Sequence, residues 1–310
     1  MSPDLLDFLF KFDYFICLLI GFPLNILLII LIIFKTPKEM KTHSQILIQN
    51  CVVDILMLIV QMFVEGFYVP DKEGNPIVAF PNGILLIFMK EFDPFIYYII
   101  LSFWQYIVGL NTYGLCVQFI YRYLVLNRNM KINFRRYLYI FSIAIIVQLF
   151  NALDLVLLLS PYSNGGIKYF DTFNKTMPFI QYGKAETMMY GLSFLIISLV
   201  NLSSYLIIFV CGFKMIRFIN LNSNFDNDLK RLNKLLTKVL IILALVPFIN
   251  DAGSFFLLIA STQKNTTIDI MQILPLISFH LIPVFNPIIC ILPNTPYRNA
   301  LFNRLQIHPQ

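Results

Sequence analysis

Ionisable side chains stand inside long apolar stretches of this sequence, and they are its first candidates for chemistry. Three aspartates lie among Leu, Ile, Val and Phe, namely Asp54, Asp154 and Asp251. Asp54 follows Asn50 by four residues. A charged group surrounded by hydrocarbon is costly, so each is a functional candidate by default. Asp54 could bind a cation or a water network that differs between two states, or it could form a structural hydrogen bond between helices. Asp154 and Asp251 could face an outward cavity or lie at an interface.

Aromatic and amide side chains form a second group, which could line a cavity for a small organic ligand. The candidate ligand-binding residues are Tyr98, Trp104, Gln105, Asn111, Asp251 and His280. Aromatic belts at membrane interfaces account for many tyrosines equally well. A lone histidine in an apolar run, such as His280, is more often a hydrogen-bonded packing element than a ligand or switch.

Basic residues form a third group, at the ends of apolar runs. Arg122 lies between Tyr121 and Tyr123, where it could hold a closed inner face or simply anchor a helix end. A second basic set, Lys230, Arg231, Lys234 and Lys238, lies largely off a leucine stripe on a helix that Asp226 or Asn227 could cap. That helix could bind anionic lipid or a cytosolic partner, and Arg298 near the C-terminus could join it.

Membrane-spanning helices must position these residues. Of the 310 residues, 58% are hydrophobic and 13% are charged, and the apolar runs of about 20 residues suit helices that cross a bilayer, not β-barrel strands. We therefore predict an all-α integral membrane bundle of seven helices in one domain, followed by a short amphipathic surface helix. The predicted spans are 12–34, 44–67, 94–121, 137–160, 187–213, 239–262 and 270–292, and the surface helix is 295–306.

The distribution of charge predicts the orientation of the bundle. Most of the 23 Lys and Arg residues fall on one side, which places the N-terminus outside and the C-terminus in the cytoplasm. The sequons at Asn174 and Asn265 then lie outside and could carry glycans, whereas the sequon at Asn201 is inside a span.

Several function classes lack support. The basic residues are scattered over short loops, so we expect no nucleic-acid partner. All five cysteines lie in apolar runs, so neither a metal site nor a disulfide framework is predicted. An enzyme is not indicated, because the sequence has neither a His-Glu-x-x-His pattern nor a nucleophile with a base placed beside it. A retinal protein is not indicated, because the seventh span has no lysine for a Schiff base. A multi-pass channel or solute transporter that uses the three aspartates remains the alternative.

Short motifs, in their order along the chain, indicate a family. Asn25, Asp54, Arg122, Pro247 and Asn286-Pro287 resemble the characteristic residues of G-protein-coupled receptors. The segments Lys35-Thr36-Pro37-Lys38-Glu39-Met40, Ile120-Tyr121-Arg122-Tyr123 and Pro296-Tyr297-Arg298 are similar to those of nematode serpentine chemoreceptors of the Str-type superfamily, most closely class D.

The resemblance implies a divergent receptor of rhodopsin-like architecture. It implies a small-molecule ligand bound from outside, a cytosolic heterotrimeric G protein as partner, no cofactor, and a place in the plasma membrane of sensory neurons or their cilia. It also implies switch roles for Asp54, Arg122 with its tyrosine neighbours, Pro247 and Asn286-Pro287. The chain departs from rhodopsin-like receptors in having Tyr121 where an acid usually precedes the arginine, and Cys290 where a tyrosine ends the seventh-span motif.

Overall fold

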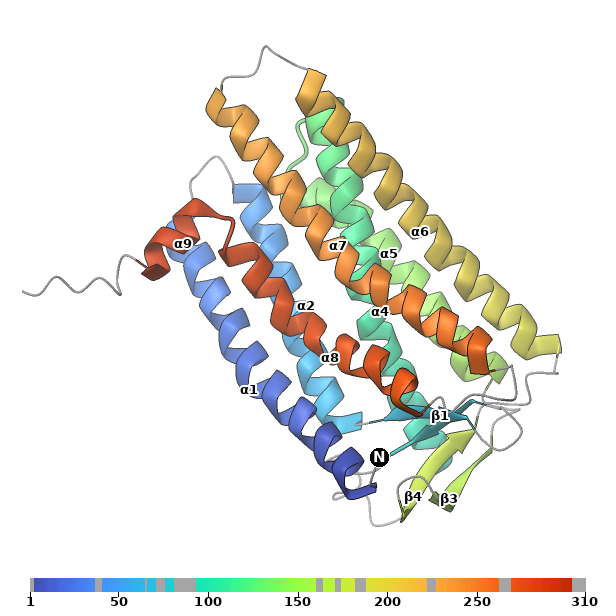
Figure 1. Ribbon diagram of the computed structural model, residues 1–310. Coiled ribbons are helices and arrows are strands. Elements are labelled where there is room, and N and C mark those ends of the chain that lie inside the picture. Colours follow the sequence, from blue (N-terminus) through green and yellow to red (C-terminus); the bar gives the residue numbers. More distant parts are fainter. Residues whose placement is uncertain are drawn as a thin grey trace, which may run out of the picture.

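A computed structural model describes residues 3–36, 41–64, 66–70, 76–80, 93–159, 164–170, 174–181, 188–221, 227–261 and 269–302. This part of the chain is mostly helical, and its long helices run side by side (Figure 1). Six of them are long and apolar enough to cross a membrane, and α8 contributes a further apolar segment, Ser278–Ile291. The predicted helical membrane bundle is therefore confirmed.

The bundle helices follow chain order, with bounds that differ at several ends from the predicted spans. They are α1 (Pro3–Lys35), α2 (Lys41–Val64), α4 (Pro94–Asn127), α5 (Phe134–Asp154), α6 (Met188–Leu221), α7 (Asn227–Ser261) and α8 (Asp269–Ile291). A π-helical segment, η2 (Leu155–Leu159), continues α5. The second helix ends at Val64, before the predicted residue 67, whereas α4 and α6 run past residues 121 and 213.

Local capping explains where two of the helices begin. The Asp93 carboxylate accepts a hydrogen bond from the Phe95 amide at 2.8 Å, and Pro94 occupies the first turn of α4. The Asn133 side chain likewise accepts from the Arg136 amide at 3.1 Å, where α5 begins. Both residues thereby satisfy backbone donors that a helix start leaves without partners.

Helix α4 lies at the centre of the bundle, in contact with α2, α5, α6 and α7, while α1 packs against α2 and α8. Two buried clusters result. One, named the inner cluster by its distance from the sheet described next, joins α1, α2, α4, α6, α7 and α8 through residues such as Leu28, Phe119 and Met215. The other, named the outer cluster, lies beside the sheet and includes Met57, Tyr98 and Trp104.

A four-stranded antiparallel sheet closes the end of the bundle nearest the N-terminus (Figure 1). Its strands are β1 (Phe67–Pro70), β2 (Pro76–Ala79), β3 (Asn164–Phe170) and β4 (Lys175–Gln181), in the order β1-β2-β4-β3. The register pairs Val78 with Ile180, so two loops that are distant in sequence form one sheet. The sequence analysis did not predict these strands, because the segments are short and lie between much stronger helical signals.

Helix α9 (Thr295–Phe302) lies at the opposite end of the bundle, beside the end of α1 (Figure 1). The Arg298 amide donates to the Asn294 carbonyl at 2.9 Å, so Asn294 holds the cap position. Tyr297 is buried, and its hydroxyl lies 2.8 Å from the Thr36 hydroxyl. Burial raises the pKa of this phenol. Residues 303–306 of the predicted surface helix lie outside the described residues.

Candidate functional site

Asp54 is the centre of a polar cluster inside the bundle. Its carboxylate is 1% exposed and accepts hydrogen bonds from the side-chain amide of Asn111 at 2.8 Å and from that of Asn286 at 2.9 and 3.1 Å. These residues come from α2, α4 and α8. The structure therefore places Asn111, which the sequence suggested as a ligand contact, beside Asp54 and not with the other ligand candidates.

A second polar contact supports α8 at its prolines, across which the helix is continuous. Proline has no amide hydrogen, so Pro287 cannot donate to the carbonyl four residues earlier, which belongs to Pro283. The buried Asn25 side chain of α1 donates to that carbonyl at 2.8 Å and to the Gly21 carbonyl at 2.9 Å. An asparagine from α1 thus replaces the helical donor that α8 lacks, and Pro287 itself is buried beside Asn286.

Arg122 lies in a small cavity toward the end of α4 that is far from the sheet. The cavity is lined by α2, α4 and α7 residues, namely His43, Ile46, Leu47, Gln118, Tyr121, Arg122, Leu236, Val239, Leu240 and Leu243. The Nε and Nη2 atoms of Arg122 are buried and have no hydrogen-bond acceptor. Tyr121 turns away to pack edge-on against Tyr137 at 5.5 Å between ring centres. Tyr123 lies under the ammonium group of Lys214, 5.7 Å from the ring centre.

The basic residues of α7 lie on the outside of the bundle. Arg231, Lys234 and Lys238 are exposed and Lys230 is half-buried, whereas Leu236 and Val239 of the same helix are buried. Arg298 of α9 is also exposed. The start of α7 and helix α9 both lie at the end of the bundle opposite the sheet (Figure 1), so these charges belong to that end.

Tyr98 and Trp104 belong to the outer buried cluster, directly under the sheet. Tyr97 and Phe80 pack with ring centres 5.1 Å apart, and Val78 and Ile180 of the sheet are part of the same cluster. Gln105 is half-buried, and its backbone carbonyl accepts from the Gln148 side chain at 2.9 Å. The structure thus brings Tyr98 and Trp104 together in a closed aromatic layer.

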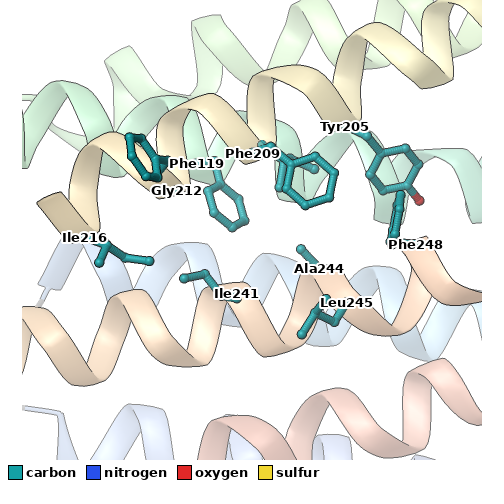
Figure 2. Close-up of a pocket in the computed structure, with 11 residues that line it drawn as sticks. Phe119, Tyr205, Phe209, Gly212, Ile216, Ile241, Ala244, Leu245 and Phe248 are labelled. Atoms are coloured by element: carbon teal, nitrogen blue, oxygen red, sulfur yellow. The ribbon is translucent and has the colours of Figure 1, made fainter.

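Asp251 pairs with Tyr205, whose hydroxyl donates to its carboxylate at 2.6 Å across α7 and α6. Tyr205 also lines a cavity of about 240 Å³ between these helices, shown in Figure 2. The walls are otherwise apolar, and include Phe119, Phe209 and Phe248. Pro247 is buried next to this cavity, in the middle of α7.

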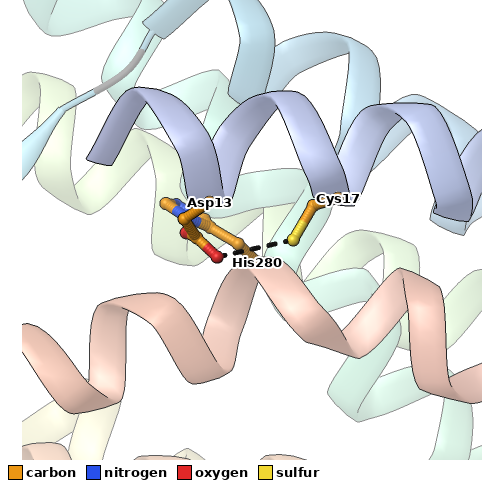
Figure 3. Close-up of polar contacts among 3 residues, drawn as sticks. All are labelled: Asp13, Cys17 and His280. Atoms are coloured by element: carbon orange, nitrogen blue, oxygen red, sulfur yellow. Dashed lines mark hydrogen bonds and ion pairs between the residues drawn. The ribbon is translucent and has the colours of Figure 1, made fainter. Parts of the chain in front are cut away.

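His280 pairs with Asp13 of α1 and not with the other ligand candidates (Figure 3). Its Nδ1 lies 2.6 Å from an Asp13 carboxylate oxygen, and both side chains are buried. The Cys17 thiol lies 3.6 Å from the other oxygen, and the Tyr14 ring packs edge-on against the imidazole. Within the described residues, no group of three or more His, Cys, Asp or Glu side chains is arranged to hold a metal ion.

A polar chain that was not predicted from the sequence joins α4, α5 and α6. The Asn151 amide donates to the Tyr113 hydroxyl at 3.1 Å and to Gln148 at 3.2 Å, and the Tyr113 hydroxyl donates to Asn201 at 2.7 Å. Gln148 and Asn151 are three residues apart and so lie on one helix face. That spacing within an apolar run was a signal available in the sequence.

One of the two candidate glycosylation sites, Asn174, lies in the described part of the chain. Asn174 is exposed at the turn between β3 and β4, with a positive φ of 47° that asparagine tolerates. Its side-chain oxygen accepts a hydrogen bond from the Tyr169 hydroxyl. Asn265 lies outside the described residues.

Comparisons with known proteins agree with this arrangement. The family model described as "Serpentine type 7TM GPCR chemoreceptor Srd" matches residues 10–303. The crystal structure of squid rhodopsin is similar in fold, with a TM-score of 0.67 and 14% sequence identity over 100% of this chain and 89% of that chain. No curated protein matches the sequence.

Proposed function

The chain belongs to the Srd family of serpentine seven-transmembrane G-protein-coupled chemoreceptors, and from this premise we propose that it binds a small molecule from outside and activates a cytosolic heterotrimeric G protein. The ligand shifts the equilibrium between a closed and an open packing of the helices. It can do so only through a higher affinity for the open packing.

The enclosure of Arg122 by side chains of α7 is the main observation in support of this proposal. Leu236 and Leu240 of α7 form one wall of the cavity that contains the guanidinium group. A movement of the inner end of α7 away from α4 would expose Arg122, whose Nε and Nη2 atoms would then be available to an acceptor on a partner. The exposed charges at Arg231, Lys234, Lys238 and Arg298, with Lys230 beside them, would favour an acidic partner surface.

The polar cluster at Asp54 supports the coupling between the outer and inner ends of the bundle. It joins α2 and α4 to α8 at Asn286, directly before Pro287, where the backbone of α8 depends on Asn25. Pro247 interrupts the hydrogen bonding of α7 in the same way. Small changes in the packing of either helix can therefore alter the inner face without unfolding the helix.

For the ligand, two regions offer apolar contact. One is the aromatic layer under the sheet, with Tyr98 and Trp104 and with Gln105 next to Trp104 in the chain. The other is the cavity between α6 and α7 beside the pair of Tyr205 and Asp251. Asn111 and His280 would act through Asp54 and Asp13. We assign the receptor to the plasma membrane of sensory neurons, with the N-terminus outside.

Second-messenger recording in cells that express the chain, against a panel of volatile and water-soluble small molecules, tests the proposal. For an activating compound, Arg122→Ala should reduce the response strongly at unchanged surface expression. Arg128→Ala is the matched control, because Arg128 is exposed at the end of the same helix. Equal responses from wild type and Arg122→Ala would overturn the assigned role.

A further inference from the structure

The guanidinium group of Arg122 lacks a counter-charge in the closed bundle. Its Nε and Nη2 atoms are buried without an acceptor, and no carboxylate in the described part of the chain pairs with it. Burying donors of a charged group without an acceptor is unfavourable unless a partner compensates for the lost solvation. The residue before it, Tyr121, supplies no charge, and its ring is packed against Tyr137.

Among the described residues, no neighbouring side chain accepts a hydrogen bond from Nε or Nη2 of Arg122. The Gln118 side chain is instead turned to Asn50, with which it exchanges two hydrogen bonds at 2.9 and 3.2 Å. His43 is the polar side chain on the α2 side of the cavity, and the α7 side is formed by leucine and valine. The cavity therefore presents a positive charge with an apolar wall on its α7 side.

We propose that this cavity is a binding site for a monovalent inorganic anion, which is chloride in the cytosol. The free space beside Arg122 is about 20 Å³, which admits one particle of about the size of a water molecule. This small space favours a small anion over a phosphate or a lipid headgroup. Charge-assisted hydrogen bonds from Nε and Nη2 would hold the ion.

The anion would stabilise the closed inner face. Leu236 and Leu240 of α7 close the cavity, so a movement of α7 that opens it would also release the ion. This consequence rests on the proposed receptor function, whereas binding of the ion does not. Chloride and the cytosolic partner would then compete for Arg122.

Chloride-35 NMR line widths test the binding directly. The full chain, purified in phosphatidylcholine nanodiscs, should broaden the chloride signal beyond empty nanodiscs, and added bromide should remove the excess. Arg122→Gln should abolish the excess broadening, and the matched variant Arg128→Gln, on the exposed end of the same helix, should retain it. Chloride in place of gluconate at equal ionic strength should also raise the unfolding temperature of the wild type and of Arg128→Gln.

Two outcomes would overturn the site. One is a wild-type line width equal to that of empty nanodiscs, which would mean that water alone solvates Arg122. The other is equal broadening by wild type and Arg122→Gln, which would indicate nonspecific binding. If Arg122→Gln does not fold, Leu240→Phe narrows the cavity while keeping the charge, and it too should lose the excess broadening. Chloride binding without any ligand-dependent signalling would contradict the proposed function and leave the anion site standing.

Discussion

Asn286 donates its side-chain amide to both carboxylate oxygens of Asp54, at 2.9 and 3.1 Å, although 232 positions separate the two residues in sequence. The contact ties α8 to α2 at the point where the prolines weaken α8. With Asn111 donating from α4, the carboxylate serves three helices at once.

Exchanging these two residues tests whether their pairing stabilises the closed bundle. Asp54→Asn should lower the free energy of unfolding by about 1–3 kcal/mol, because an amide nitrogen then faces the donors of Asn111 and Asn286. The double variant Asp54→Asn with Asn286→Asp restores an acceptor opposite a donor and should recover part of the loss. Thermal unfolding in nanodiscs measures the stability of the single and double variants. If the stability change of the double variant equals the sum of the changes of the two single variants, the pairing is contradicted.

Gly109 should not tolerate even a methyl group. A Cβ atom there would lie 2.2 Å from Nε2 and 2.3 Å from Cδ of the Gln148 side chain. Gly109→Ala would displace this side chain and break its bond to the Gln105 carbonyl, so we expect a loss of about 1–3 kcal/mol in stability. Gly191→Ala is the control, because nothing lies within 4 Å of its Cβ position. Yields of folded protein and unfolding temperatures should separate the two variants.

Asp13 and His280 should behave as a coupled pair between α1 and α8. Removing one partner leaves the other buried without its 2.6 Å contact, so Asp13→Ala and His280→Ala should each cost about 3 kcal/mol. The double variant should cost less than the sum of the two. Unfolding measurements on the four proteins give the coupling energy, and a value near zero would mean that the contact is not stabilising.

Asn174 should carry a glycan when the chain is made in secretory cells. Its side chain is exposed on a turn, and the hydrogen bond from Tyr169 engages the oxygen and not the amide nitrogen to which a glycan attaches. Glycosidase treatment should shift the wild-type gel band, and Asn174→Gln should reduce the shift. Asn201→Gln should leave it unchanged, since Asn201 lies within α6 and accepts from Tyr113. A shift that persists in full in Asn174→Gln would contradict this assignment and point to Asn265.

Much of the architecture could be predicted from the sequence because the bilayer imposes a simple rule. A long apolar run must become a helix, since only helices and closed barrels satisfy all backbone groups in hydrocarbon. The start of α7 at Asn227 and the extent of α8 follow closely from capping residues and apolar length. The sheet could not be predicted, since the pairing of Val78 with Ile180 joins two separate loops.

For the candidate site, too, the sequence indicated the residues but not their contacts. Asp54 and His280 stood out because a polar group in an apolar run is costly wherever it lies. Arg122 stood out at the end of a span, and Asn286 through the family resemblance. The sequence could not say which of them share a partner. Asn111 joined Asp54, and His280 joined Asp13, because those pairings depend on which helix faces meet.

The sequence by itself determined that this chain is a helical membrane bundle with a small set of polar residues inside it, because hydrophobicity and helix length are local properties. Only the tertiary structure decided that Asn25 completes the backbone of α8 at Pro283 and that Arg122 is enclosed by α7 without a counter-charge. Both facts depend on the rotation and height of neighbouring helices, which are set by the packing of many side chains together and not by any single stretch of sequence.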